Sequence, residues 1–208
     1  MSTLVLWDVD TQVDFMLPEG KLYVPGAQQT LTAMARLVRG ARAAGIVHVA
    51  SADDHELTDP EISDEPDFET TYPPHCLRGT RGAIKVPETE QVDPLPLGGT
   101  PYPPGLLREL AGGRREILLL KKSYSVFANP SAEPLVELLD PAEVVVFGVA
   151  TDVCDHAAIM GLLDRGRRVA FVEDAARGLS EARVEACTAV WRERGVRFTT
   201  SDEVLAGW

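Results

Sequence analysis

Cysteine, basic residues and long apolar runs are all scarce in this 208-residue sequence, and each shortage excludes a class of protein. Three cysteines are too few, and odd in number, for a disulfide framework, so we expect a reducing, cytoplasmic setting. Lys and Arg number 20 against 32 Asp and Glu, which gives a formal net charge of −12. Nucleic-acid binding depends on basic side chains that neutralise phosphates, so neither nucleic acid nor an anionic membrane is expected as a partner.

No apolar stretch approaches the roughly 20 residues that a membrane helix needs. The apolar residues 4–7 are followed at once by Asp8 and Asp10, so we expect no signal peptide. What the sequence does have is 45% hydrophobic residues, enough to bury a core, without an internal repeat or a low-complexity linker. We therefore predict a single domain over residues 1–208.

Short runs of aliphatic and β-branched residues alternate with segments of helical periodicity. The predicted strands lie at residues 4–9, 46–50, 116–120, 143–149 and 168–172. Helical spacing of apolar residues marks residues 31–38, 157–163 and 184–191. This alternation predicts an α/β fold, with a mainly parallel twisted sheet and helices on both faces, as in Rossmann-like proteins.

Residues 53–102 interrupt this alternation. They are rich in Pro, Gly, Asp and Glu and have no sustained period, so we interpret them as a long excursion that forms a lid or site wall rather than an element of the core. Ligand sites in open α/β sheets gather at the carboxyl ends of strands. An acid, a cation and a thiol fall at such ends, namely Asp10, Lys121 and Cys154.

Cys154 is the candidate nucleophile among these three. A thiol with a reference pKa near ~8.5 is mostly protonated at neutral pH, so it needs a neighbouring base, cation or helix N-terminus. The helix predicted at residues 157–163 places the Cys154 N–H near its first turn, where the helix dipole favours a thiolate and the N–H can join an oxyanion hole. Without further signals, a packed cysteine, a turn-capping Asp10 and a solvated Lys121 are equally ordinary interpretations.

Three segments resemble, in the right order, the motifs of isochorismatase-like cysteine hydrolases of the nicotinamidase and pyrazinamidase type. Residues 10–15, Asp-Thr-Gln-Val-Asp-Phe, are similar to the Asp-x-Gln-x-Asp-Phe opening of that family. Residues 121–127, Lys-Lys-Ser-Tyr-Ser-Val-Phe, resemble its Lys-x-x-Tyr-Ser-x-Phe stretch, and alignment on Tyr124 selects Lys121 as the catalytic lysine. Residues 148–154, Gly-Val-Ala-Thr-Asp-Val-Cys, resemble its nucleophile segment.

The resemblance implies the isochorismatase-like hydrolase fold and a mechanism. Asp10 takes the thiol proton, Cys154 attacks an amide carbonyl, and ammonia leaves to give a thioester that water hydrolyses. Lys121 would stabilise the thiolate and hold Asp10 ionised. The resemblance also implies a cis peptide bond before Ala150, with the N–H groups of Ala150 and Cys154 forming the oxyanion hole.

Asp53, His55 and His75 resemble the metal ligands of nicotinamidases, in a chain that has four histidines. Imidazole and carboxylate ligands together suit zinc, iron or manganese, so we expect a divalent metal ion as cofactor. Loop histidines on an acidic surface are the alternative interpretation. The fourth ligand stays open among five of the acidic residues between the histidines, namely Glu61, Asp64, Glu65, Asp67 and Glu69.

Phe15, Tyr72 and Tyr124 match family positions that wall the substrate pocket, where aromatic faces would hold a flat heteroaromatic amide. Core packing is the alternative for each of them. Cys187 has helical spacing to other apolar residues, which predicts a core position. His156 is poorly spaced from the candidate nucleophile for a dyad, so we expect it to pack or to cap the surface.

These signals together predict hydrolysis of nicotinamide, a small-molecule amide, to nicotinate and ammonia. The resemblance also implies self-association into a homo-oligomer, without giving its order. The residue after Cys154 is Asp155, where many relatives have an apolar one, and this leaves the substrate open. The alternatives are a metal-free cysteine amidohydrolase of the same fold, acting on a carbamoyl, ureido, maleamate or lactam substrate, or a non-enzymatic ligand- or metal-binding protein. True isochorismatases lack the nucleophilic cysteine, so Cys154 argues against that activity.

Overall fold

The computed structural model describes residues 4–208, and these form one seven-stranded sheet in which all paired strands are parallel. The strand order across the sheet is β3-β4-β2-β1-β5-β6-β7. The strands are β1 (Leu4–Val9), β2 (Val47–Asp53), β3 (Leu95–Leu97), β4 (Glu116–Lys121), β5 (Glu143–Val149), β6 (Val169–Arg177) and β7 (Arg197–Thr199). The predicted α/β architecture is confirmed, and the sheet is wholly rather than mainly parallel.

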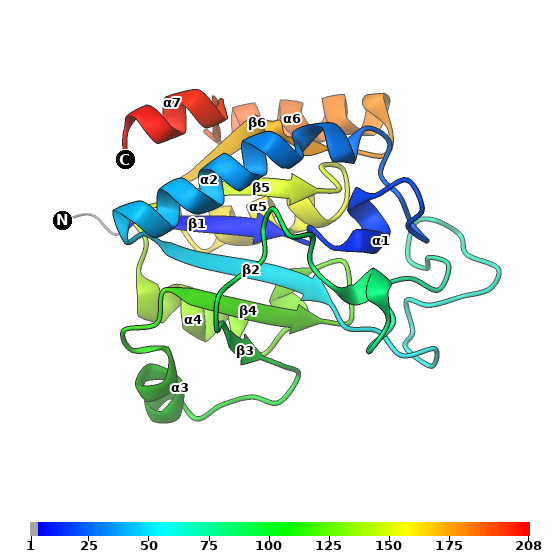
Figure 1. The fold of residues 1–208 in the computed structure, drawn as a ribbon, viewed down its shortest axis with the longest axis horizontal. Coiled ribbons are helices and arrows are strands. Elements are labelled where there is room, and N and C mark those ends of the chain that lie inside the picture. Colours follow the sequence, from blue (N-terminus) through cyan, green and yellow to red (C-terminus); the bar gives the residue numbers. More distant parts are fainter. Residues whose placement is uncertain (1–3) are drawn as a thin grey trace.

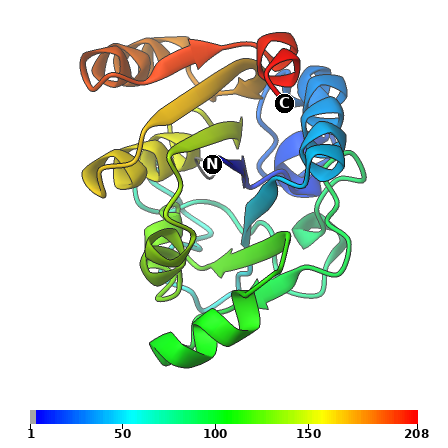
Figure 2. The ribbon, with the colours of Figure 1, turned by 90° about the vertical axis from the view of Figure 1, so that its left-hand side faces the viewer.

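Helices cover both faces of the sheet (Figures 1 and 2). They are α1 (Val13–Met16), α2 (Leu31–Ala44), α3 (Pro104–Ala111), α4 (Ala132–Leu139), α5 (Cys154–Asp164), α6 (Glu181–Glu193) and α7 (Ser201–Ala206), with 3-10 turns η1 (Ala27–Thr30), η2 (Arg81–Ala83) and η3 (Val126–Ala128). One apolar cluster packs α3 to α6 around Trp7 and Trp191, and the other packs α1, α2 and α7 around Met34 and Phe147. None of the helices within residues 4–208 combines the length and apolar character that a membrane crossing requires.

Two strands run further than their sequence pattern indicates. β2 continues through Asp53 and β6 through Arg177. Ser51 and Asp53 are not typical strand formers, but pairing with β4, in which Asp53 lies beside Lys121, keeps them in the ladder. Asp53 is therefore the last residue of a buried strand instead of the first residue of a loop.

The prediction that residues 53–102 add no element to the core is wrong at β3. This strand pairs with β4 at the edge of the sheet, and its Leu97 is fully buried. Three residues with Pro96 in the middle give no readable strand pattern, because proline is tolerated mainly in edge strands. The rest of the excursion is irregular apart from η2 and begins beyond the carboxyl ends of the central strands (Figure 1).

The central strand β1 lies between β2 and β5, and the chain changes sides of β1 when it reaches β5. The carboxyl ends of β1 and β5 therefore border the switch point where ligand sites form in such sheets. Gly148, near the end of β5, has φ 144°, and a Cβ there would collide with the carbonyl oxygen of Val9. Glycine thus allows β5 to approach β1 closely, just before the loop that leads to Cys154.

Candidate active site

The acid, the cation and the thiol predicted at the strand ends lie together. Lys121 Nζ is 2.8 Å from Asp10 Oδ2 and 3.9 Å from Cys154 Sγ. Asp10 directly follows β1, Lys121 is the last residue of β4, and Cys154 begins α5. All three side chains are buried. The ends of two parallel strands and the start of one helix thus bring the three side chains together.

A residue of β2 that no motif indicated fixes the acid. Ser51 Oγ donates to Asp10 Oδ1 at 2.6 Å, and the Asp10 N–H donates to the Ser51 carbonyl oxygen at 3.2 Å. Asp10 has φ 51°, a conformation in which the chain turns away from β1. Both carboxylate oxygens are therefore engaged, one by a hydroxyl and one by Lys121.

Burial and neighbouring charges set the protonation states of Asp10, Lys121 and Cys154. Burial raises the pKa of Asp10, against the effect of the Lys121 cation. Burial alone would lower the pKa of Lys121, but the carboxylates of Asp10 and Asp53 raise it well above its usual 10.5. Burial raises the pKa of Cys154 well above the usual range of a thiol. At neutral pH Lys121 is a cation and Cys154 a thiol, so a base must take the thiol proton before the sulfur can attack.

Two backbone N–H groups lie beside the thiol. As expected, α5 places the Cys154 N–H in its first turn, and the peptide bond between Val149 and Ala150 is cis. Within residues 4–208, neither the Ala150 N–H nor the Cys154 N–H has a hydrogen-bond partner. Unpaired buried N–H groups are uncommon, and a helix N-terminus favours negative charge, so this pair is suited to an oxyanion.

Asp53, His55 and His75 form a second buried cluster, with one ligand atom from each lying within 4.8 Å of the others. Asp53 Oδ2 is 3.6 Å from His55 Nε2 and 3.4 Å from His75 Nε2. His75 Nδ1 lies 2.7 Å from the carbonyl oxygen of Pro73, which only accepts, so Nδ1 carries the proton and Nε2 presents its lone pair to the cluster. Among the described residues, neither ring nitrogen of His55 has a hydrogen-bond partner. Two imidazoles and a carboxylate so arranged fit a divalent transition metal.

Asp53 connects the two clusters. Its Oδ1 pairs with Lys121, while its Oδ2 faces the histidines. Gln12 fixes the Asp53 backbone, because Gln12 Oε1 accepts from the Asp53 N–H at 2.7 Å and Gln12 Nε2 donates to the Asp53 carbonyl oxygen at 2.8 Å. Burial alone would raise the pKa of Asp53, but the Lys121 cation lowers it far below its usual range. Asp53 is therefore a fixed anion shared by both clusters.

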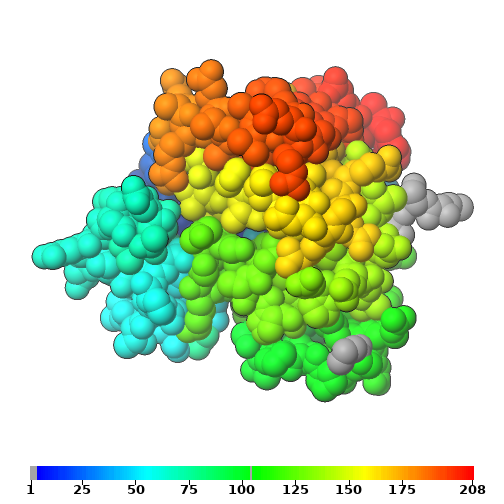
Figure 3. Space-filling model, turned by 180° about the vertical axis from the view of Figure 1, so that it is seen from behind, coloured from blue at the N-terminus to red at the C-terminus, as the bar shows by residue number. Residues whose placement is uncertain are grey.

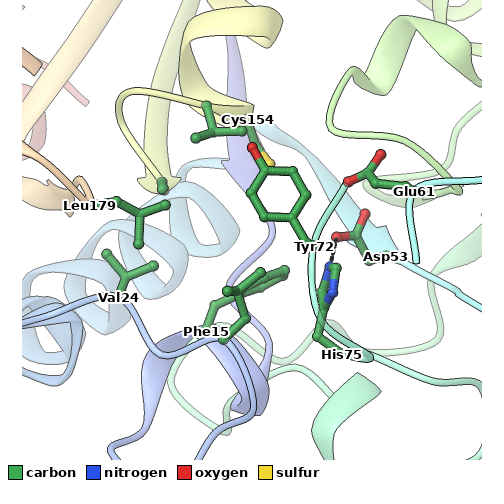
Figure 4. Close-up of a pocket in the computed structure, with 11 residues that line it drawn as sticks. Phe15, Val24, Asp53, Glu61, Tyr72, His75, Cys154 and Leu179 are labelled. Carbon is green, nitrogen blue, oxygen red and sulfur yellow. Dashed lines mark ion pairs between the residues drawn. The ribbon is translucent and has the colours of Figure 1, made fainter. Parts of the chain in front are cut away.

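One of the five acidic residues considered as a fourth ligand lies at this site. Glu61 is buried and lines the same pocket as Asp53 and His75 (Figure 4). Its Oε2 accepts from the Tyr124 N–H at 2.7 Å, and burial raises its pKa. The other four are exposed, namely Asp64, Glu65, Asp67 and Glu69.

A pocket opens beside the thiol (Figure 4). Phe15 and Tyr72 line it, as the sequence predicts, and the ring centroid of Phe15 is 5.3 Å from that of His75. Tyr124 does not line it, because its side chain points outward from the bend after β4 and is 42% exposed. The backbone of Tyr124, not its ring, reaches the site. Apolar wall residues without a motif signal are Leu22, Val24 and Leu179.

The remaining cysteines and His156 lie outside this constellation. Trp191 Nε1 donates to His156 Nδ1 at 3.0 Å, and the two rings stack with centroids 5.9 Å apart, so the predicted packing role of His156 is confirmed. Cys187 packs half-buried against the core, also as predicted. Cys76 Sγ lies 3.7 Å from the carbonyl oxygen of Gly82, away from the metal-ligand set.

Known proteins with the same fold include a pyrazinamidase, an amidase and an isochorismatase-like hydrolase. The zinc-bound pyrazinamidase of Pyrococcus horikoshii has a TM-score of 0.74 at 22% identity, over 95% of this chain and 98% of that one. N-carbamoylsarcosine amidase of Thermoplasma acidophilum has a TM-score of 0.73 at 21% identity, over 96% and 97%. An isochorismatase-like hydrolase of Alkaliphilus metalliredigens has a TM-score of 0.78 at 19% identity, over the whole of both chains.

At these identities the structural likeness establishes the fold alone. No protein with a curated description matches the sequence. The family model of the isochorismatase domain, however, matches residues 2–203, which include every side chain of the two clusters. The chain therefore belongs to the isochorismatase family of hydrolases.

Proposed function

We propose that this hydrolase converts nicotinamide to nicotinate and ammonia through a thioester on Cys154. The observation that supports this most strongly is the shared carboxylate of Asp53. One of its oxygens pairs with Lys121, next to the thiol, and the other faces His55 and His75. A single small amide can therefore contact the thiol and the candidate metal centre at once.

Asp10 acts as the general base in this mechanism. Its raised pKa makes it a stronger proton acceptor than an ordinary carboxylate, and it takes the Cys154 proton as Sγ attacks the amide carbonyl carbon. Lys121, 3.9 Å from Sγ, remains a cation and stabilises the negative charge that forms on sulfur.

The backbone and Asp10 complete the reaction. The N–H groups of Ala150 and Cys154 donate to the oxyanion of the tetrahedral intermediate. Asp10 returns the proton to the amide nitrogen, the C–N bond breaks, and ammonia leaves a thioester. Water then attacks the thioester carbonyl and gives one proton to Asp10, which passes it to the departing sulfur, so that nicotinate is released and the thiol is restored.

Asp53, His55 and His75 would hold the metal, with Glu61 beside them. A zinc, iron or manganese ion there would supply a Lewis-acidic position for a pyridine nitrogen or a water molecule. These residues fit a metal ion because His55 Nε2 is buried without a hydrogen-bond partner among the described residues and because His75 presents a lone pair to the cluster.

The pocket favours a neutral, flat amide. Its walls include the aromatic rings of Phe15 and Tyr72, and its acidic lining residues are Asp53 and Glu61. None of the lining residues, all within the described range, is lysine or arginine. A carbamoyl amino acid or maleamate carries a carboxylate for which these lining residues offer no lysine or arginine partner, and this favours the nicotinamide proposal over those two alternatives.

Ammonia release from nicotinamide by protein loaded with zinc, iron or manganese tests the proposal, beside a chelator-treated sample and a panel of other amides. We expect release from nicotinamide and pyrazinamide, loss of release after chelation, and little release from carboxylate-bearing amides. Absence of nicotinamide turnover alongside activity on another amide would overturn the substrate and leave the cysteine chemistry. Turnover that survives complete metal removal would overturn the role of the metal.

A further inference from the structure

Lys121, the last residue of β4, and Lys122, which follows it, pair with different acidic groups. Lys121 faces the thiol, whereas Lys122 turns toward the segment that follows β2. Lys122 Nζ lies 3.0 Å from Glu56 Oε2 and 2.9 Å from Asp59 Oδ1. Lys122 thus forms an ion pair with Asp59, which lies between the candidate metal ligands His55 and His75 in the sequence.

Asp59 is held at both carboxylate oxygens. Its Oδ1 pairs with Lys122, and its Oδ2 accepts from the Glu56 N–H at 2.8 Å. The same Oδ2 lies 3.4 Å from His55 Nδ1. Asp59 is 9% exposed and His55 is fully buried, so water has little access to this contact. Asp59 therefore offers a fixed acceptor beside the His55 ring.

The two histidines share one arrangement toward the candidate metal centre. His55 turns Nδ1 to Asp59 and Nε2 to Asp53, while His75 turns Nδ1 to the carbonyl oxygen of Pro73 and Nε2 to Asp53. A histidine that binds a metal through one nitrogen carries a proton on the other, and that proton needs an acceptor. Pro73 supplies the acceptor for one ring, and Asp59 is placed to supply it for the other.

We propose that Asp59, held by Lys122, is a positioning residue that orients His55 for metal binding. The inference rests on the metal centre of the proposed function. Asp59 acts through the imidazole, by fixing its tautomer and orientation and by making Nε2 a better ligand. Lys122 acts one contact further out, by keeping the carboxylate of Asp59 in place.

The zinc affinity of the full-length chain, measured by competition with a chromogenic chelator, tests this role. Asp59→Ala is expected to raise the Kd for zinc about 10- to 100-fold. Asp59→Asn keeps an acceptor oxygen and should recover part of that loss. Lys122→Met should raise the Kd for zinc by less than Asp59→Ala does. The double variant should bind zinc no more weakly than Asp59→Ala alone. Arg78→Met is the matched control, because Arg78 pairs with Asp54 and Glu56 in the same segment.

The absorption spectrum of the cobalt-substituted protein gives a second readout, since it reports the geometry of the bound ligands. Asp59→Ala should change that spectrum, and Arg78→Met should not. An unchanged zinc Kd and cobalt spectrum in a folded Asp59→Ala protein would overturn the proposal. An equal loss of affinity in Arg78→Met would overturn it too, by assigning the effect to anchoring of the segment. Failure of the unmodified chain to bind either metal would instead contradict the metal centre of the proposed function.

Discussion

The carboxylate of Asp10 has a different partner at each oxygen, Ser51 Oγ at 2.6 Å and Lys121 Nζ at 2.8 Å. Burial raises the pKa of Asp10, and the hydrogen bond from Ser51 opposes that shift because it stabilises the ionised form. The base must be ionised to take the thiol proton. Activity should therefore fall as the pH drops through a pKa that lies above the usual 3.8 of an aspartate.

Ser51→Ala should move the acidic limb of the kcat/KM profile to higher pH. Loss of the hydroxyl removes an interaction that lowers the pKa of Asp10. The limb should move by about one pH unit, which corresponds to the low end of the roughly 1.5–3 kcal/mol of a hydrogen bond to a charged group. Ser131→Ala, at a buried serine between η3 and α4, should leave the profile unchanged. An acidic limb that stays in place in Ser51→Ala would argue against this account of Asp10.

At the scale of elements, a buried ion pair joins β1 to the excursion. Asp8 of β1 is fully buried, with Lys85 Nζ at 3.0 Å, the Thr11 hydroxyl at 2.8 Å and His48 Nε2 at 3.4 Å. Burial alone would raise the pKa of Asp8, but Lys85 and His48 lower it. The pair therefore stabilises the fold above the ordinary aspartate pKa of 3.8, and this contribution disappears as the pH falls below it.

Lys85→Met should lower the free energy of unfolding by about 3–5 kcal/mol at neutral pH, because it leaves the Asp8 carboxylate buried without its cation. The double variant with Asp8→Asn should recover most of that loss. Urea unfolding of the three proteins measures both effects, and the difference should shrink below pH 3.8. A Lys85→Met protein within 1 kcal/mol of the parent, at about the precision of such measurements, would contradict the assigned contribution.

The sequence predicts the interiors of the long strands because they are continuous aliphatic runs, as in β1 and β5. It does not predict the end of β2, where pairing with β4 overrides the weak strand preference of Ser51 and Asp53. The positions of Asp10, Lys121 and Cys154 follow from motifs at strand ends. The contacts of Ser51 with Asp10 and of Lys122 with Asp59 join segments that only the folded chain brings together, so spacing along the sequence carries no signal for them.

At the scale of the whole molecule, the candidate metal centre ties a projecting segment to the sheet. Asp53 and His55 precede residues 56–74, and His75 follows them, while the segment itself extends from the body of the protein (Figure 3). A ligand that binds only the folded state adds stability in proportion to the logarithm of its concentration. Metal binding should therefore stabilise the folded chain and hold both ends of the segment.

Zinc at about 100 times its Kd should add about 2.7 kcal/mol to the stability, which corresponds to a rise in Tm of roughly 5–10 °C for a chain of this length. A thermal melt with zinc and with a chelator measures the shift. His55→Ala should melt at the same temperature under both conditions. Equal melting temperatures for the parent chain, in a sample shown to bind zinc, would mean that the metal also binds the unfolded chain.

The most direct test of the central claim is ammonia release by Cys154→Ala compared with Cys187→Ala, on nicotinamide or on the best substrate of the amide panel. Cys187 is half-buried outside the site, so its replacement controls for loss of a thiol as such. The account predicts that Cys154→Ala loses activity by a factor of about 10³ or more, while Cys187→Ala keeps it. Turnover by Cys154→Ala close to that of the parent chain would contradict a cysteine nucleophile.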